Sequence, residues 1–454
     1  MAAGGDLEAA ARAGVEAAID AGAGDAEAYA VEEATREVRV HERELESLTA
    51  ATERGVGVRA WIGGRVGFAY GTDLSAHGLR ATATLAAEAA SIADEDEHAG
   101  PPGAAGPPPT LDGLRDGSVS AWGPDRAADL ALAVERAALG GDDRITGVEQ
   151  AVYADSAERV AIASSTGMDG SYETSSCYAW LQAMAASGDG RETGLGFGMA
   201  RGPAGLDPEA IGAEAAQRAV SMIGAVKPES RSCPAVLDTT VAASFAGLIG
   251  STLAADSVQR GRSPFAGKLG EEVASDALEL HDDALDPDGL ASSPFDGEGV
   301  PCGRRALIEG RRLRTYLHDS YTARRDGVES TGNAGRAGYR SQPSVSASNL
   351  VVGTGGRDLA GLFEQAAEGV YVTDVAGLHS GVNPVTGTFS VGASGTLIRG
   401  GEQAEPVREF TIAGDLVSLL GAVVATGSRR RWVPFGGSVS TPPVLVGEIT
   451  VGGS

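Results

Sequence analysis

The pattern of apolar and polar residues divides the first half of the chain into helices and strands. Residues 6–22 place Leu7, Val15 and Ile19 on one stripe at helical spacing, which predicts a helix. From Asp25 to Thr72 the residues alternate instead, with a glycine pair as hairpin turn, and predict strands. Further helices are predicted at 74–93, 125–139 and 207–224, with strands between the last two. This order is typical of an α+β domain.

The second half is richer in strands. Asp238 or Thr239 can cap a helix that follows the strand CPAVL, and RRALIEGRRLRTYL predicts a hairpin turning at Glu309-Gly310. Short strands with glycine turns follow, and one more helix is predicted at 414–427 before the closing strand. We expect a curved antiparallel sheet or partial barrel. The Lys-Pro and Cys-Pro stretch predicts a boundary between an α+β domain at 1–228 and a strand-rich domain at 229–454.

Composition and charge narrow the possible partners. The 454 residues include 66 glycines, which favours short strands and tight turns over a helical bundle. Asp and Glu number 62 against 36 Lys and Arg, giving a net charge of −26. Such a surface repels nucleic acid, because phosphate binding needs clustered cations. It is typical of halophilic proteins, although an Ala/Gly-rich protein from a GC-rich genome is the alternative.

Cysteines and hydropathy bear on location. The three cysteines are far apart and form no C-x-x-C pair, which argues against a disulfide framework or a cysteine zinc site. No signal peptide is evident, and the longest apolar run, LVSLLGAVVATG, is too short to span a bilayer. We expect a soluble cytoplasmic protein.

The six histidines form no recognisable metal-binding motif. No two lie within one helical turn, whereas a zinc site needs His, Cys, Asp or Glu converging at suitable spacing. His281 and His318 each precede an acidic residue at a predicted strand end, and these pairs could meet in space. Exposed polar strand ends explain the same pattern and are the favoured interpretation.

Two other segments contain residue types that catalysis or binding uses. In TGNAGRAG, Asn333 and Arg336 could hold a substrate backbone, although a structural glycine loop is the favoured alternative. In FDGEGV, Asp296 and Glu298 could act as acid and base, or instead fix a turn and cap the next strand. Neither a G-x-S-x-G elbow nor a G-x-x-x-x-G-K-[ST] loop occurs. Residue chemistry alone therefore reveals no complete active site.

Several motifs in the second half resemble those of a known family in order and spacing. They run from about Ser232 to Gly453 and include SPFDGEGVPCGRRALIEGRRLRTYLHDSYTAR, STGNAGR, GVYVTDVAG, NPVTGTFSVGASGTLIRGGE and PVREFTIAGDL. They resemble the TldD/PmbA family, whose members are often called modulators of DNA gyrase and are classed as zinc metallopeptidases. The first half resembles the family only in its order of elements. Thr388 stands where the family usually has Asp, so a role of that acid does not carry over.

The resemblance distinguishes two kinds of subunit by the helix that precedes FAGKLG. TldD-type subunits carry His-Glu-x-x-x-His on this helix and a further zinc ligand, a cysteine, near the C-terminus. The aligned positions here are Ala246, Gly247 and Ser251, and the cysteine position falls near Ser428. The chain thus resembles the PmbA (TldE) subunit, which implies no catalytic residue, no zinc ligand and no cofactor in this chain.

The resemblance also implies a partner. A TldE-type chain pairs with a zinc-bearing TldD-type chain around an inner cavity, and the partner cleaves unfolded or extended peptides. The leading hypothesis is a non-catalytic subunit that supplies chamber wall and substrate contacts, with Asn333, Arg336 and His379 as candidate contacts. Two alternatives stay open: a peptide-binding homodimer without hydrolysis, and an enzyme with a site around His281, His318 or His379. Nucleic acid and membrane are not expected partners.

Overall fold

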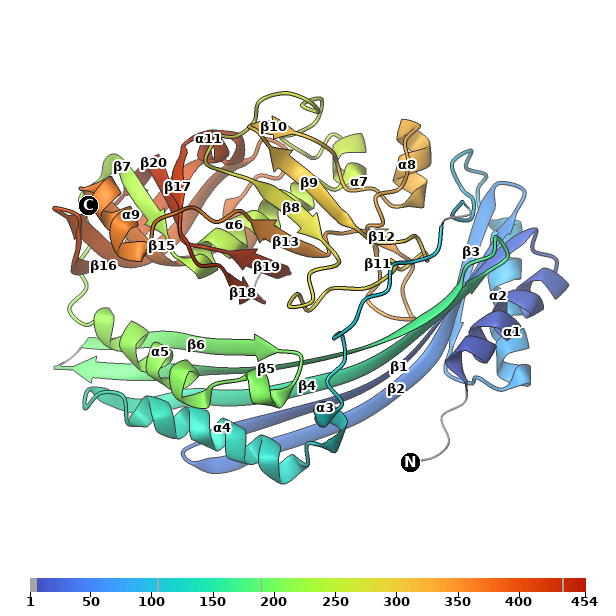
Figure 1. The fold of residues 1–454 in the computed structure, drawn as a ribbon, viewed down its shortest axis with the longest axis horizontal. Coiled ribbons are helices and arrows are strands. Elements are labelled where there is room, and N and C mark those ends of the chain that lie inside the picture. The colour runs from blue at the N-terminus through green and yellow to red at the C-terminus, as the bar shows by residue number, and fades with distance from the viewer. Residues whose placement is uncertain (1–5, 104–105, 189, 435–436) are drawn as a thin grey trace.

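A single curved sheet organises the first half of the chain. The computed structural model describes residues 6–103, 106–188, 190–434 and 437–454. Sheet A has six antiparallel strands in the order β3-β2-β1-β4-β5-β6, and the second half of the chain lies over its concave side (Figure 1). The elements of this half are α1 (Leu7–Asp20), β1 (Asp25–His41), β2 (Glu44–Ile62), β3 (Arg65–Gly71), α2 (Ala76–Ile92), α3 (Ser118–Ala121), α4 (Pro124–Leu139), β4 (Ile145–Ser164), β5 (Asp169–Ser187), β6 (Gly190–Ala200), the 3-10 turn η1 (Pro203–Gly205) and α5 (Pro208–Ser221).

Both faces of sheet A are buried over part of its length, which explains its alternating sequence. On β1, Ala28 and Ala30 pack with α1 and α2 on the outer side. Tyr29 and Val31 point the other way and pack against residues of the second half. Helices α4 and α5 cover the outer side at the other end of the sheet. On β1, therefore, small residues mark the side under the helices and larger ones the side facing the second half.

The second half combines a closed barrel with a second sheet. Strands β16-β15-β14-β7-β20 follow one another, and β20 pairs back onto β16 to close a five-stranded barrel. The second sheet has the order β10-β9-β8-β13-β19-β18. The elements are β7 (Arg231–Leu237), α6 (Thr239–Thr252), α7 (Ala255–Gln259), β8 (Leu280–Asp283), β9 (Arg304–Glu309), β10 (Arg312–Leu313), α8 (Ser320–Asp326), β11 (Ala334–Gly335), β12 (Ser344–Val345), β13 (Asn349–Val352), α9 (Leu359–Ala366), β14 (Gly369–Ala376), α10 (Leu378–Gly381), β15 (Thr388–Arg399), β16 (Glu402–Asp415), α11 (Leu416–Gly421), β17 (Val423–Thr426), β18 (Arg431–Val433), β19 (Ser438–Thr441) and β20 (Val444–Gly452).

Helix α6 lies within the largest core of the molecule. Phe245 and Ile249 pack in one cluster with residues of the barrel and of the second sheet. A Cβ added at Gly250 would lie 2.5 Å from the Leu350 side chain on β13, so the helix and the second sheet approach closely there. Phe197 of β6 belongs to the same cluster, which places α6 next to sheet A as well.

The predicted α+β class is confirmed. Both predicted hairpins and all the predicted helices before 414–427 are also present, with small differences at their ends. The barrel expected in the second half is closed, and the long curved open sheet belongs to the first half. The helix predicted at 414–427 is wrong in its second part, because β-branched residues of β17 pair with β20 instead. The predicted boundary after residue 228 falls in the segment between α5 and β7. None of the described helices is long and apolar enough to cross a bilayer.

Candidate functional site

Helix α6 begins at a carboxylate that joins three elements. Asp238 accepts hydrogen bonds from the Thr240 N–H at 3.1 Å and from the Thr240 hydroxyl at 2.8 Å. It also accepts from the Tyr371 hydroxyl on β14 at 2.5 Å and from Arg218 on α5 at 3.1 Å. Burial alone would raise the pKa of Asp238, but Arg218 and these hydrogen bonds lower it below its usual value. The charged carboxylate fixes the start of α6 against both halves of the chain.

Small residues occupy the positions of α6 that the zinc motif would use. Ser244, Gly247 and Ser251 lie at helical spacing on one side of α6, whereas Ala246 is buried in the core. The Ser251 hydroxyl is exposed and donates to the Leu248 carbonyl of its own helix at 2.7 Å. This side of the helix therefore presents serine hydroxyl groups and, at Gly247, backbone without a side chain.

Ser428, near which the resemblance places the cysteine ligand of TldD-type chains, is also a poor metal ligand. Ser428 is exposed, and its N–H donates to the Arg357 carbonyl at 2.6 Å. Zinc takes imidazole, thiolate or carboxylate ligands. Over the described ranges, no three His, Cys, Asp or Glu side chains come together as a metal site. The residues present do not fit a zinc ion.

A cavity of about 520 Å³ opens beside the first turn of α6. Its walls come from β5, β6 and α5 of the first half and from α6, β14, β15 and β16 of the second. Hydroxyl groups contributed by both halves line it, from Thr193, Ser221, Thr240, Ser244, Thr373 and Ser394. The cavity is thus a polar space between two halves that are far apart in sequence.

Strand β6 forms one wall through a strict alternation of residue sizes. A Cβ added at Gly194 or Gly196 would lie 2.2 Å or 2.0 Å from backbone atoms of α5, so only glycine allows this close packing. Thr193, Leu195 and Phe197 point to the opposite side and line the cavity. The segment TGLGFG therefore places α5 against the outer side of β6 and presents larger side chains to the cavity.

Ion pairs between the two halves flank the cavity. Arg408 on β16 pairs with Glu192 on β6, and both line the cavity. Arg431 on β18 pairs with Glu214 on α5 at 2.7 Å, and its guanidinium lies 3.9 Å from the centre of the Phe197 ring. The side chains of Arg408 and Arg431 are 41% and 39% exposed. Solvent reaches these pairs, so they join the halves weakly.

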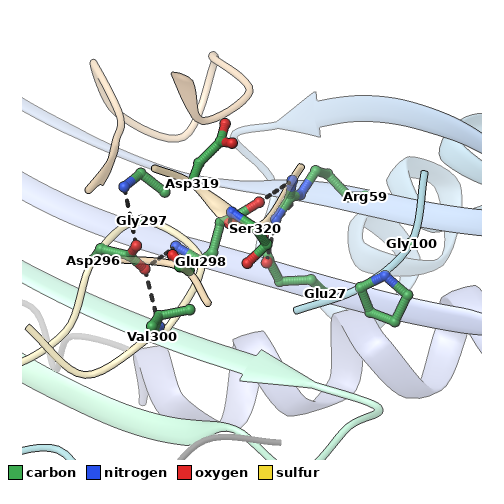
Figure 2. A network of polar contacts seen from close by, with 12 residues as sticks. Glu27, Arg59, Gly100, Asp296, Gly297, Glu298, Val300, Asp319 and Ser320 are labelled. Carbon is green, nitrogen blue, oxygen red and sulfur yellow. Dashed lines mark hydrogen bonds and ion pairs between the residues drawn. The ribbon is translucent and has the colours of Figure 1, made fainter. Parts of the chain in front are cut away.

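At the other end of sheet A, a buried network of charges joins the halves (Figure 2). Arg59 on β2 pairs with Glu27 on β1 at 2.6 Å and with Glu298 of the second half at 2.9 Å. Arg336 of the second half also donates to Glu27, and to the Gly297 carbonyl at 2.6 Å. None of the four charged side chains is more than 8% exposed. Each charge here is paired within the chain, which gives this end a structural role.

Comparison with known sequences now identifies the family. Sequence profiles of PmbA/TldA metallopeptidase domain 1, the central domain and the C-terminal domain match residues 26–90, 118–223 and 230–453. The chain belongs to the PmbA/TldD family. The C-terminal match includes α6, and the central match includes β6 and α5, so both sides of the cavity are family elements.

Individual PmbA/TldD relatives match over nearly the whole chain. The metalloprotease PmbA of Escherichia coli O157:H7 is 29% identical over 419 residues, 90% of this chain and 88% of that one. The metalloprotease PmbA homolog of Haemophilus influenzae is 28% identical over 445 residues, 97% and 94% of the two chains. A solved structure of a modulator of DNA gyrase from Thermotoga maritima has a TM-score of 0.90 at 26% identity, covering 98% of this chain and 100% of that one. TldE from Thermococcus kodakarensis shares the fold, with a TM-score of 0.88 at 23% identity over 97% and 99% of the chains.

Within this PmbA/TldD fold, the segment FDGEGV forms a turn. Asp296 accepts hydrogen bonds from the N–H groups of Glu298 and Val300, both at 2.9 Å, and of Ala334 at 3.0 Å. Burial and the nearby charge of Glu298 raise the pKa of Asp296. Burial would also raise the pKa of Glu298, but Arg59 lowers it below its usual value. Turn formation, the favoured interpretation of this pair, accounts for these contacts.

The two glycine-loop side chains that could contact substrate, Asn333 and Arg336, are buried. Asn333 is 3% exposed, donates to the buried Asp282 at 2.6 Å and accepts from the Thr331 hydroxyl at 2.6 Å. The guanidinium of Arg336 lies 4.6 Å from the centre of the Tyr29 ring. Both side chains already have partners within the chain. Contact of Asn333 or Arg336 with a substrate stays a prediction.

The three histidines of the alternative site lie on different elements. His281 on β8 and His318 before α8 are 8% and 5% exposed, and burial lowers the pKa of each. His379 is exposed on the short α10. Thr388 begins β15, and its hydroxyl lies 2.8 Å from that of Thr386. A role of the three histidines in catalysis or binding stays a prediction.

Sequence reasoning missed the residues that line the cavity. Glu192, Arg218, Ser244 and Arg408 are separated by up to more than two hundred positions, and no linear motif joins them. The signal that could have located one wall is TGLGFG, because three glycines alternating with larger residues indicate a strand under close-packed backbone.

Proposed function

We propose that this chain is the non-catalytic, TldE-like subunit of a two-part zinc peptidase. The observation that carries the proposal is α6, where Ala246, Gly247 and Ser251 stand at the positions that the resemblance assigns to the zinc motif, on a helix whose first turn lines a polar cavity. The family scaffold around them matches throughout 230–453. Loss of metal ligands within a retained scaffold is expected of a chain that serves assembly and substrate handling.

In this proposal the two subunits divide the chemistry. A TldD-type partner brings zinc, which activates water, and a general base that moves its proton. This chain contributes the wall formed by β6, α5 and the first turn of α6, whose hydroxyls and charged groups bind peptide backbone. Its zinc-free state, a cytoplasmic location and a salt-adapted source all remain predictions.

The cavity wall suits an extended peptide. β6 is the last strand of sheet A, and within the described residues no strand pairs with its outer edge. An extended peptide adds to such an edge through main-chain hydrogen bonds, which do not depend on its sequence. Glu192 and Arg408, paired across the cavity, supply groups for the ends or side chains of the peptide.

The experiment starts with the purified chain alone. We expect no stoichiometric zinc by elemental analysis and no hydrolysis of unfolded protein substrates. Co-purification with a TldD-type subunit of the same organism is then expected to give a complex that contains zinc. About one tightly held zinc per isolated chain, removed by a chelator together with peptidase activity, would contradict the proposal.

The second candidate is a peptide-binding homodimer that cuts nothing. It is favoured by the same cavity and open β6 edge, neither of which requires a metal. The two candidates differ in the partner: stable binding of a TldD-type chain supports the first, while peptide binding by a self-associated chain that ignores a TldD-type subunit supports the second.

A further inference from the structure

The opposite edge of sheet A carries a long stretch of strand without a neighbour. Strand β2 extends from Glu44 to Ile62, but β3 pairs only with the part from Val56 onward. Figure 1 shows β2 continuing past the short β3 as the outermost strand of the sheet. For residues 44–54, no other described strand pairs with the outer edge of β2.

This stretch is exposed on both faces as well as along its edge. All positions from Glu44 to Arg54 are exposed, including Leu45 at 51% and Leu48 at 40%. Natural edge strands are normally protected by lysine, proline, a bulge or short length. Residues 46–54, ESLTAATER, contain neither lysine nor proline. A bulge at Glu46, at one end of this segment, is the only one of these protective features, and residues 47–54 have none.

We propose that residues 46–54 of β2 pair antiparallel with the same residues of a second copy of this chain, about a two-fold axis at Ala50. This inference goes beyond the proposed subunit role, because it names a surface through which the chain associates with its own copy. Two-fold pairing of one strand with its copy joins two sheets through the same surface on each chain, so the assembly stops at two copies.

Charge complementarity selects this register. With Ala50 opposite Ala50, Glu46 of each chain lies opposite Arg54 of the other, and Thr49 lies opposite Ala51. Neither Glu46 nor Arg54 has an ion-pair partner among the described residues. Shifting the partner by one position in one direction puts Glu46 opposite Glu53, and like charges directly opposite each other destabilise a sheet. A shift in the other direction puts Glu46 opposite Gly55 and Arg54 opposite Ser47, so both ion pairs are lost. The central pairs, from Leu48 to Thr52, are uncharged.

Thiol cross-linking in the full chain tests the axis. Ala50→Cys should give a covalent dimer with a short bifunctional thiol reagent, because residues opposite each other on paired strands are close. The three native cysteines are buried, so the wild-type chain supplies the background. Thr84→Cys, at an exposed position of α2, is the matched control and should stay monomeric in the same reaction.

A charge swap tests the register. Glu46→Arg and Arg54→Glu should each weaken the dimer several-fold in light scattering, because like charges then face each other twice per dimer. The double variant restores both pairs and should return the dimer to near wild-type affinity. All three variants change exposed side chains only, so thermal unfolding should be unaltered.

Each outcome of these experiments either supports or contradicts the proposed pairing of β2 with its copy. Cross-linking of the Ala50→Cys variant to its own copy, with rescue by the double swap, supports it. A dimer that forms without cross-linking through the introduced thiol, or a chain that stays monomeric at high concentration, overturns it. Cross-linking of the Ala50→Cys variant only to a TldD-type chain also overturns it, but leaves the proposed subunit role standing.

Discussion

The two ends of the concave side of sheet A meet the second half of the chain in different ways. At one end, Arg59, Glu27, Glu298 and Arg336 form a network in which every charge is buried and paired. At the other end, the halves enclose a polar cavity, and the ion pairs beside it are partly exposed. The first end holds the halves together, while the second leaves room for a ligand.

The difference shows why perturbed charges do not by themselves locate the site here. The structural end contains the buried carboxylates Glu27, Asp296 and Glu298, and there Asp296 fixes a turn. The cavity is marked instead by small residues: glycines on β6 bring α5 close, and Thr240 and Ser244 line it from α6. In this fold, absence of side-chain volume identifies the candidate site better than presence of charge.

The largest expected effect comes from breaking the buried end. Arg59→Met leaves Glu27 and Glu298 buried without their shared partner, which should lower the free energy of unfolding by about 3–5 kcal/mol. Arg408→Met at the open end removes a partly exposed pair and should cost less than about 1 kcal/mol. Urea unfolding compares the two, and equal losses would contradict the distinction between the ends.

A smaller effect is expected where β6 meets α5. Gly196→Ala places a methyl group 2.0 Å from the Ile211 carbonyl oxygen, so α5 must move. Such overpacking should cost about 1–3 kcal/mol and weaken peptide binding at the cavity. Gly392→Ala on β15 is the control, because its nearest atom would lie at 3.7 Å. Wild-type stability of Gly196→Ala would show that the close approach is not needed.

A carboxylate between the two ends of sheet A should make the stability of the protein depend on pH. Glu33 lies opposite Glu158 on β4 and opposite Glu53 on β2. Burial, with the charge of Glu33 added, raises the pKa of Glu158 from 4.5 to about 7. The native chain therefore holds a proton that the unfolded chain has lost, and stability falls as pH rises from about 4.5 to 7.

Glu158→Gln removes this titration. We expect the variant to gain about 3 kcal/mol over the wild type between pH 4 and pH 8, measured by urea unfolding at both values. Glu53→Gln is the matched control, because Glu53 is exposed and pairs with Arg340 at 3.3 Å. If both variants gave the same change at the two pH values, Glu158 would not be the titrating group.

The smallest expected effect is a difference in how salt changes the stability contributed by the ion pairs at the two ends. At molar KCl the Debye length is about 3 Å, against about 10 Å at 0.1 M, so exposed pairs are screened and buried ones much less. The melting temperature of the wild type should rise, because its net charge is −26. The deficit of Arg408→Met should disappear, while that of Arg59→Met persists. A melting temperature independent of salt would indicate that the acidic composition reflects a GC-rich genome and not adaptation to salt.

Local signals predicted much of the fold, and long-range pairing supplied the rest. Helical spacing identified α1 and α5, and glycine pairs identified the turn between β2 and β3. Closure of the barrel depends on β20 pairing with β7 and β16, which no local pattern encodes. The cavity depends on the same long-range contacts. Arg336 shows why site residues are harder to predict from sequence than the fold. The sequence of a glycine loop does not distinguish an arginine that binds substrate from one that, like Arg336, binds a buried glutamate.

The most direct test of the subunit role is reconstitution with a TldD-type chain of the same organism. Peptide hydrolysis should require both chains. Ser244→Phe, which fills the cavity beside α6, should lower hydrolysis by at least tenfold without changing complex formation or zinc content. Thr84→Phe on the exposed side of α2 should change none of these. Full activity of the TldD-type chain alone, or of the complex with Ser244→Phe, would contradict the account.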